Sequence, residues 1–183
     1  MMEKLFGIFL VCFIGAITPF GALRVLTDVA NGVSDSFKLD TTPFIKLPTG
    51  YYHFEFDKTT NWFKAFEACR RINGHLVSFE TKDELEAVVR YIRKTTYTNH
   101  FWTSGTDYAK KGHYVWFATG KKIDLDIWWP DEPNNFNDTE HCAELSINAK
   151  SKQVKGINDV GCLLSRSYVC EAEEGTTASV VVW

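Results

Sequence analysis

Two stretches of the chain place apolar residues at spacings of three and four, which is the period of an amphipathic helix. In the first stretch, Asn61 is a favourable N-cap, Asn73-Gly74 ends the pattern, and the apolar positions are Trp62, Ala65, Phe66, Cys69 and Ile72. In the second stretch, Thr81 and Glu84 form a capping box ahead of the apolar stripe Leu85, Val88, Val89 and Ile92. The pattern therefore predicts two helices, the first of which buries Cys69.

Outside these helices the apolar residues favour strands. Residues 50–56 (GYYHFEF) are aromatic and alternating, which predicts a strand before the first helix. After Tyr97 no helical period remains, and short aromatic or β-branched runs predict strands at residues 100–103, 114–117, 143–147, 154–157 and 168–170. Residues 124–141 (DLDIWWPDEPNNFNDTEH) are too polar for a strand and too numerous for a passive connection, so we expect a functional loop there.

The N-terminal residues 5–17 form an unbroken apolar run (LFGIFLVCFIGAI) between Lys4 and Pro19. This arrangement is typical of a secretory signal peptide, which we assign to residues 1–22, and it predicts a secreted, extracellular protein. An uncleaved membrane anchor is the alternative, because no charged residue occurs at positions 5–23.

The 183-residue chain has the composition of one globular domain, with 45% apolar and 23% charged residues. Its 20 Lys and Arg against 23 Asp and Glu leave no basic excess for phosphates, which argues against nucleic-acid binding. The apolar residues 180–183 are too few for stable insertion into a membrane. After the signal peptide, we expect an extended or disordered leader at residues 23–47, a packed domain at residues 48–172 and a C-terminal tail at residues 173–183.

Cleavage of the signal peptide would remove Cys12 and leave four cysteines, which are Cys69, Cys142, Cys162 and Cys170. An even number of cysteines in an oxidising compartment predicts two disulfides. The count alone leaves three pairings open. A zinc site is the competing use, but no Cys-x-x-Cys pair is present and the spacings match no zinc module.

Five residues of the loop and the segment after it offer the oxygen ligands that calcium prefers, namely Glu132, Asn134, Glu140, Asn158 and Asp159. With the backbone carbonyl of Asp159 they supply six oxygens, which leaves room for outside ligands in a shell of about six to eight. Polar surface loops are rich in such residues, so composition alone does not establish a metal site.

The placement of these residues around the cysteines resembles the C-type lectin-like domain family. The matching segments are Glu132-Pro133-Asn134, Glu140 two residues before Cys142, Asn158-Asp159 before Cys162, and Tyr168-Val169-Cys170-Glu171. The resemblance covers about residues 48–171 and is to the short, four-cysteine form. It implies an α+β fold with two helices, two small antiparallel sheets and a long loop region. It also implies one calcium ion (Ca2+) on the five ligands, a cis bond before Pro133, and disulfides that pair Cys69 with Cys170 and Cys142 with Cys162.

The sequence departs from the family pattern in two places. Ile157 stands where the family usually has a tryptophan before the Asn-Asp pair, and since that tryptophan is a packing residue, calcium binding should survive its loss. Lys111, Asn135 and His141 fall where acidic ligands of an accessory calcium site would be expected. We therefore predict a single calcium ion.

The resemblance implies a calcium-dependent lectin whose Glu-Pro-Asn order goes with mannose-type sugars, held by Glu132, Asn134, Glu140 and Asn158. Galactose is the alternative, because the ring of Phe136 can stack on its apolar face. A lectin-like domain that binds proteins without calcium is a further alternative. An enzyme is not expected, since calcium-bound carboxylates stay ionised and cannot serve as general acids.

The expected partners are glycans on cell or microbial surfaces, as in agglutinating proteins of invertebrate innate immunity. A homo-oligomer formed through the domain or leader is left open, because the sequence contains neither a coiled coil nor a collagen repeat. Asn137-Asp138-Thr139 is an N-glycosylation sequon inside the loop, and a glycan there could crowd the sugar site or point away from it.

Overall fold

The computed structural model describes residues 41–95, 100–147 and 156–172 of the chain. The expected signal peptide, most of the leader, the C-terminal tail and the start of the strand predicted at residues 154–157 lie outside the described residues. Within them, no helix is both long enough and apolar enough to cross a membrane.

Both predicted helices are confirmed, together with their N-terminal caps. Helix α1 (Trp62–Arg71) begins where the Asn61 side chain accepts a hydrogen bond from the backbone nitrogen of Lys64 at 3.0 Å. Helix α2 (Lys82–Thr95) begins with a reciprocal pair of hydrogen bonds between Thr81 and Glu84. The Glu84 nitrogen donates to the Thr81 hydroxyl at 3.2 Å, and the Thr81 nitrogen donates to the Glu84 carboxylate at 3.0 Å. The local sequence therefore determines where each helix starts.

Eight strands form one mixed sheet with the order β1-β2-β8-β4-β6-β7, while β3 pairs with β8 and β5 pairs with β4. Their bounds are β1 (Ile45–Leu47), β2 (Gly50–Thr60), β3 (Gly74–Leu76), β4 (His100–Thr106), β5 (Val115–Trp116), β6 (Cys142–Ser146), β7 (Ile157–Val160) and β8 (Arg166–Ala172). The fold is α+β with two helices, as expected. The two implied antiparallel sheets are instead joined into one, because β4 pairs with β8 in parallel through Phe101 with Ser167 and Trp102 with Tyr168.

Strand β1 lies in the segment that was expected to be leader, and it pairs with β2 from Ile45 opposite Tyr52 to Leu47 opposite Gly50. Strand β3 was also not predicted. Its first residue, Gly74, lies so close to β8 that a Cβ atom there would come within 2.6 Å of the Glu171 carbonyl oxygen. A glycine at this position permits the close approach of β3 and β8.

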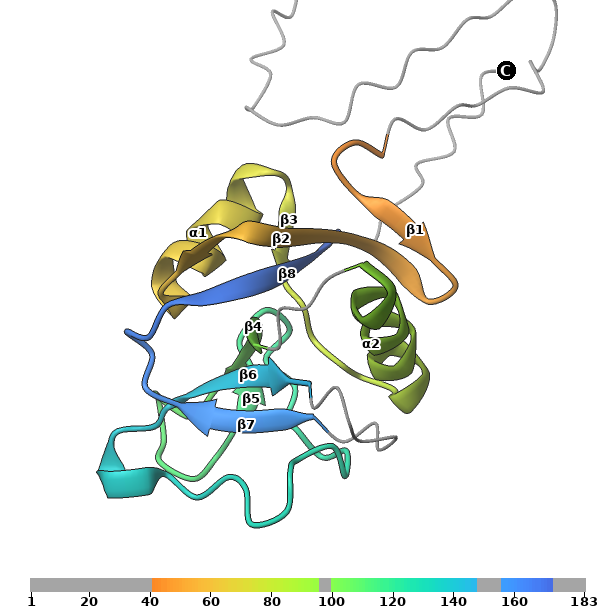
Figure 1. Cartoon of the computed structure of the whole chain (residues 1–183). Coiled ribbons are helices and arrows are strands. Elements are labelled where there is room, and N and C mark those ends of the chain that lie inside the picture. Colours follow the sequence, from red (N-terminus) through yellow and green to blue (C-terminus); the bar gives the residue numbers. More distant parts are fainter. Residues whose placement is uncertain (1–40, 96–99, 148–155, 173–183) are drawn as a thin grey trace, which may run out of the picture. The chain divides into compact units, whose positions relative to one another are not determined.

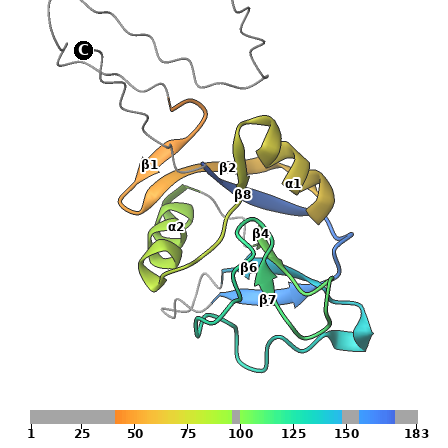
Figure 2. The ribbon, with the colours of Figure 1, turned by 180° about the vertical axis from the view of Figure 1, so that it is seen from behind.

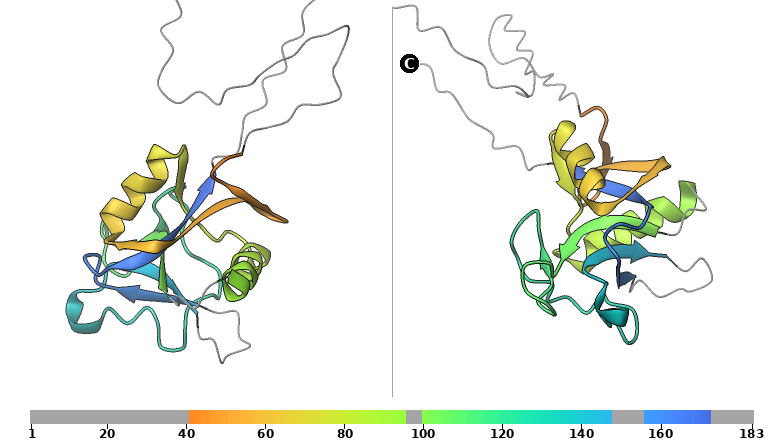
Figure 3. Two further views of the ribbon diagram at one scale, coloured as in Figure 1. Left: turned by 45° about the horizontal axis from the view of Figure 1, so that its top comes forward. Right: turned by 90° about the vertical axis from the view of Figure 1, so that its left-hand side faces the viewer.

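Helix α1 and the long loop lie at opposite ends of the described domain, and α2 lies between them (Figure 1). Figure 1 shows α1 and α2 beside β2 and β8, whereas β6, β7 and the loop between β5 and β6 lie at the bottom of the view. The same division is visible from behind and in two further orientations (Figures 2 and 3). The loop therefore projects from the end of the sheet that is away from α1.

Two buried clusters of side chains support this arrangement. The larger one includes Phe79, Phe101 and Ile157, and the smaller one packs Trp62 and Trp102 around the four cysteines. Ile157 is 0% exposed, so the residue that replaces the usual tryptophan still serves as a packing residue. Disulfides link Cys69 of α1 to Cys170 of β8 and Cys142 of β6 to Cys162, which are the pairs that the resemblance implied.

Candidate functional site

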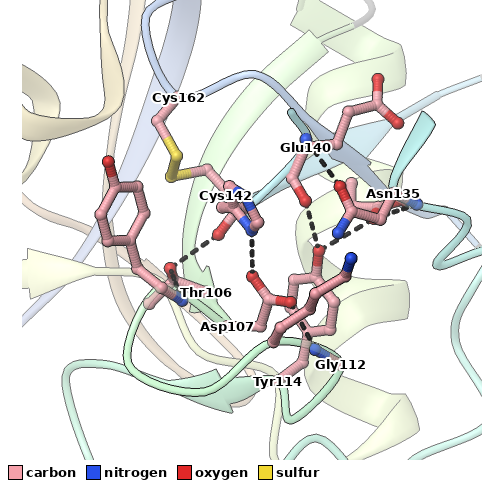
Figure 4. Close-up of polar contacts among 12 residues, drawn as sticks. Thr106, Asp107, Gly112, Tyr114, Asn135, Glu140, Cys142 and Cys162 are labelled. Atoms are coloured by element: carbon pink, nitrogen blue, oxygen red, sulfur yellow. Dashed lines mark hydrogen bonds and ion pairs between the residues drawn. A yellow bond between two sulfur atoms is a disulfide. The ribbon is translucent and has the colours of Figure 1, made fainter. Parts of the chain in front are cut away.

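The segment between β4 and β6 contains β5 and the long loop, and the two ends of this segment are joined by hydrogen bonds. The Thr106 hydroxyl donates to the His141 carbonyl oxygen at 2.7 Å, and the Asp107 nitrogen donates to the same oxygen at 3.2 Å. Figure 4 shows Thr106 and Asp107 on one side of this junction and Glu140 and Asn135 on the other. These hydrogen bonds hold the end of β4 beside the start of β6.

Asp159 is the centre of the site, although it lies on β7 and not in the loop. Its side chain is fully buried, and its two oxygens accept hydrogen bonds from the Asn134 nitrogen at 3.0 Å and the Asn135 nitrogen at 2.9 Å. The Tyr114 hydroxyl also donates to Asp159, at 2.9 Å. One carboxylate thus connects β7, the loop and the segment beside β5.

The Glu132–Pro133 peptide bond is cis, as the resemblance implied. The Glu132 carboxylate accepts hydrogen bonds from the Asn134 amide at 2.8 Å and from the Asn134 nitrogen at 3.1 Å. The side chains of Glu132 and Asn134 therefore lie on the same side of the chain as Asp159.

Glu140 approaches the same place from the other end of the loop. Its carboxylate accepts a hydrogen bond from the Phe136 nitrogen at 3.0 Å, and its backbone nitrogen donates to the Asn135 side chain at 3.0 Å. The Tyr114 hydroxyl lies 3.1 Å from the Glu140 carbonyl oxygen, a contact drawn in Figure 4. Tyr114 therefore positions both Glu140 and Asp159.

Negative charge is concentrated in this cluster. Burial, a hydrogen bond with Asp159 and the Asp159 charge raise the pKa of Glu132 to about 7. Burial raises the pKa of Glu140, and the charge of Asp159 adds to that rise. Burial also raises the pKa of Tyr114, as does its hydrogen bond to Asp159, so this hydroxyl remains a donor.

The donor set fits calcium in its chemistry. Hard oxygen ligands from carboxylates and carboxamides suit a calcium ion. Hydrogen bonds join Glu132, Asn134 and Asp159 directly, and the Tyr114 hydroxyl links the Glu140 carbonyl oxygen to Asp159. The fifth, Asn158, precedes Asp159 in β7 and is half-buried, and the contacts that join the other four do not include its side chain. Among the described residues no three His, Cys, Asp or Glu side chains could hold a metal alone, so an ion here would depend on the asparagines.

The three residues at the expected accessory positions have internal partners. Lys111 forms an ion pair with Asp138, which lowers the pKa of that carboxyl. His141 lies 2.8 Å from the Asp107 carboxylate, and the Asn135 side chain bridges the Glu140 nitrogen and Asp138. The absence of an accessory ion stays a prediction.

Sequence reasoning missed Tyr114 and Asp107 as parts of the site. Tyr114 is 5% exposed and was read only as the start of an aromatic strand, because nothing local shows that its hydroxyl reaches β7. Asp107 is 2% exposed and accepts a hydrogen bond from the Gly112 nitrogen at 2.6 Å. A buried tyrosine hydroxyl usually has a hydrogen-bond partner, and this tendency was the only sequence signal for a role of Tyr114.

A disulfide-linked α+β domain whose long loop gathers ligand oxygens has the features of a binding domain. The family model for the lectin C-type domain matches residues 58–172, and the chain therefore belongs to the C-type lectin family. Members of this family are binding proteins and not enzymes, so the chain is a C-type lectin without enzymatic activity.

The similarity extends over the whole chain in some relatives. C-type lectin 37Da of Drosophila melanogaster is 35% identical over 187 aligned positions that cover 100% of both chains. C-type lectin 37Db of the same organism is 30% identical and covers 93% of this chain and 99% of its own. The crystal structure of C-type lectin CEL-I from Cucumaria echinata matches with a TM-score of 0.60 and 23% identity, over 70% of this chain and 94% of that one. This structural match supports the fold alone.

Proposed function

We propose that the chain is a secreted, calcium-dependent carbohydrate-binding protein that recognises vicinal hydroxyls of mannose-type sugars. The observation that carries the proposal is the cluster in which hydrogen bonds join Glu132, Asn134 and Asp159, while the Tyr114 hydroxyl links Glu140 to Asp159. Ligand oxygens from a loop and a strand meet there. Asn158 completes the ligand set in the proposal. The names of two Aedes albopictus relatives, salivary C-type lectins 1 and 2, support secretion.

A bound calcium ion would supply open coordination positions for two sugar oxygens. The protein would supply the hydrogen bonds around them. A carboxylate that coordinates a metal with one oxygen can accept a sugar hydroxyl proton with the other, whereas an asparagine that coordinates through its carbonyl still has its amide to donate. Glu132 and Glu140 would accept from the two hydroxyls, and Asn134 and Asn158 would donate to them.

This pattern favours sugars whose 3- and 4-hydroxyls are both equatorial, such as mannose, glucose and N-acetylglucosamine. Galactose has an axial 4-hydroxyl, which would misdirect the hydrogen bonds of the same ligand set. One buried hydrogen bond left unmade costs about 1 to 3 kcal/mol, which corresponds to a preference of roughly fivefold to more than a hundredfold.

Galactose is the second candidate because of one side chain. Phe136 is 66% exposed and directly follows the residues that contact Asp159. An aromatic ring stacked on the apolar face of galactose contributes about 0.5 to 1.5 kcal/mol. This stacking is comparable in size to the loss of one hydrogen bond, so the identity of the sugar depends on the balance of the two.

One binding measurement tests calcium and sugar together. Immobilised mannose and galactose glycans are titrated with the secreted protein in calcium and in EDTA, and free monosaccharides compete. We expect binding in calcium only, with inhibition by mannose. Binding that persists in EDTA would favour a calcium-independent, protein-binding domain and contradict the proposal.

Phe136→Ala separates the two sugars. If mannose is the ligand, this variant retains mannose inhibition within about threefold, because the ring lies beside the hydrogen-bonding cluster and not in it. Inhibition by galactose that disappears in Phe136→Ala would replace mannose with galactose. Phe117→Ala is the matched control, since Phe117 is 54% exposed and contacts Trp62 and Phe66 on the α1 side of the domain.

A further inference from the structure

The sequon residue Asn137 lies on the surface, in the 3-10 turn η1 (Phe136–Asp138). Its backbone has φ 53° and ψ 20°, a left-handed conformation that asparagine tolerates better than most residues. An exposed turn is also where an Asn-x-Thr sequence can be reached by a modifying enzyme. Asn137-Asp138-Thr139 is the single such sequence in the chain, so any N-linked glycan belongs to this position.

The turn is held by its other residues. The Asn135 amide donates to Asp138 at 3.2 Å, Lys111 pairs with Asp138, and the Thr139 hydroxyl donates to the Phe136 carbonyl oxygen at 3.1 Å. None of these contacts, within the part of the chain that the structure describes, uses the Asn137 side chain. A group attached to its Nδ2 atom therefore breaks no contact of the turn.

The turn also adjoins the proposed sugar site. The Phe136 nitrogen donates to the Glu140 carboxylate at 3.0 Å, so Asn137 follows a residue that touches one ligand and lies three positions after another, Asn134. Three residues span at most about 11 Å between Cα atoms. A branched glycan rooted that near the site occupies space through which a large ligand must pass.

We propose that Asn137 carries an N-linked glycan that screens the Phe136 side of the sugar site and selects against large, branched ligands. The inference rests on the proposed function for its second half. A free monosaccharide fits beneath the attached glycan, whereas the arms of a branched ligand collide with it, and such a clash is a general way to discriminate between ligands.

The modification joins Nδ2 of Asn137 to the anomeric carbon of an oligosaccharide donated by a lipid-linked diphosphate. The new N–C bond forms as the anomeric C–O bond breaks, the lipid diphosphate leaves with the bonding electrons, and Nδ2 loses one proton to the transferring enzyme. The donor and the enzyme belong to the secretory route that the expected signal peptide implies.

The first test asks whether the glycan is present. The full chain is expressed in insect cells and its intact mass is measured for the wild type, Asn137→Gln, Thr139→Ala and Thr139→Ser. We expect glycan mass on the wild type and Thr139→Ser, which keeps the sequon and its hydroxyl, and none on the other two. A wild-type mass that equals the bare polypeptide would overturn the proposal, whatever the chain binds.

The second test asks what the glycan does. Binding to a branched high-mannose glycoprotein and competition by free mannose are measured for the wild type and Asn137→Gln. We expect Asn137→Gln to bind the glycoprotein roughly threefold or more tightly, with mannose inhibition unchanged within about twofold. Equal glycoprotein affinities would refute the screening role. If neither the wild type nor Asn137→Gln binds sugar, the proposed function fails, the screening role fails with it, and the mass still decides the modification.

Discussion

Asp159 combines a structural and a chemical role in one side chain. Its carboxylate accepts from two loop nitrogens and from Tyr114, and these hydrogen bonds place Asn134 and Asn135 against β7. The same oxygens belong to the proposed calcium ligands. Removal of the negative charge should therefore affect metal binding as well as the position of the loop.

Asp159→Asn should lower calcium affinity on the order of tenfold or more, because calcium affinity depends on the number of charged ligands. The asparagine retains one carbonyl acceptor and nearly the same volume, so both disulfides should still form. Isothermal titration with calcium, together with non-reducing peptide mapping, measures the two effects. Asp124→Asn is the control, since its carboxyl is 71% exposed and pairs with Lys122. Equal calcium affinities for both variants would remove Asp159 from the ligand set.

At this scale, the sequence names the residues of the proposed site but not their contacts. Glu132, Asn134, Glu140 and Asp159 could be named because their order relative to Cys142 and Cys162 is that of a family. The hydrogen bonds from Tyr114 could not, because this residue is separated by 45 positions from Asp159 and only the folded sheet brings them together.

Among the elements, α1 begins at a single capping side chain, and it carries Cys69 to the disulfide with β8. Asn61→Ala removes the acceptor for the Lys64 nitrogen and should lower the free energy of unfolding by about 1 kcal/mol. Urea unfolding measures the loss. Asn61→Asp keeps an acceptor at the same place and should lose much less. A loss of similar size in both variants would show that the cap is not the cause.

The loop is the second element with a testable interaction. Lys111→Ala removes the ion pair with Asp138 and exposes the accessory position to solvent. We expect calcium stoichiometry to remain one ion per chain, because Asn135 and His141 supply no carboxylate there. Titration at saturating calcium counts the ions. A second ion in the variant would show that Lys111 alone prevents accessory binding.

Elements with a local pattern were predictable, and those that depend on distant partners were not. The two helices carry their own period and caps, so their starts follow from neighbouring residues. Strands β1 and β3 each contain three residues, which is too short for a period, and they exist because β2 and β8 supply their hydrogen bonds. The parallel pairing of β4 with β8 joins residues far apart in the chain, and no local pattern encodes it.

Across the whole domain, a buried charge joins three strands. Glu144 of β6 has a side chain that is 1% exposed, and it contacts His100 of β4 at 2.9 Å and Arg166 of β8. Burial alone would raise the pKa of Glu144, but the hydrogen bonds from His100 and Arg166 outweigh it and lower the pKa from its usual value. The ionised group therefore stabilises the native sheet.

The lowered pKa gives a pH dependence of stability. Because the folded-state pKa lies below the unfolded one, the contribution of Glu144 is present above the unfolded pKa and is lost as the pH falls through the folded pKa. Glu144→Gln should lower the free energy of unfolding by about 1 to 3 kcal/mol at neutral pH. The deficit should shrink in acid. Urea unfolding at neutral pH and at about pH 3 measures it, with the exposed Glu86→Gln as control. A deficit that is independent of pH would contradict the role of the charge.

The first and last described segments of the domain lie beside each other. The ring of Phe44 and the carbonyl of Glu171 flank Gly74 within 2.9 Å and 2.6 Å of the position that a Cβ atom there would take. The loop lies at the other pole of the domain (Figures 1 and 2). A scaffold attached at either end would thus leave the loop facing outward. A sugar site of the kind proposed, with a Kd of about 1 mM, would contribute only about 4 kcal/mol, and copies arrayed with their loops in one direction would gain effective concentration without any new contact. This polarity suits the domain to multivalent display.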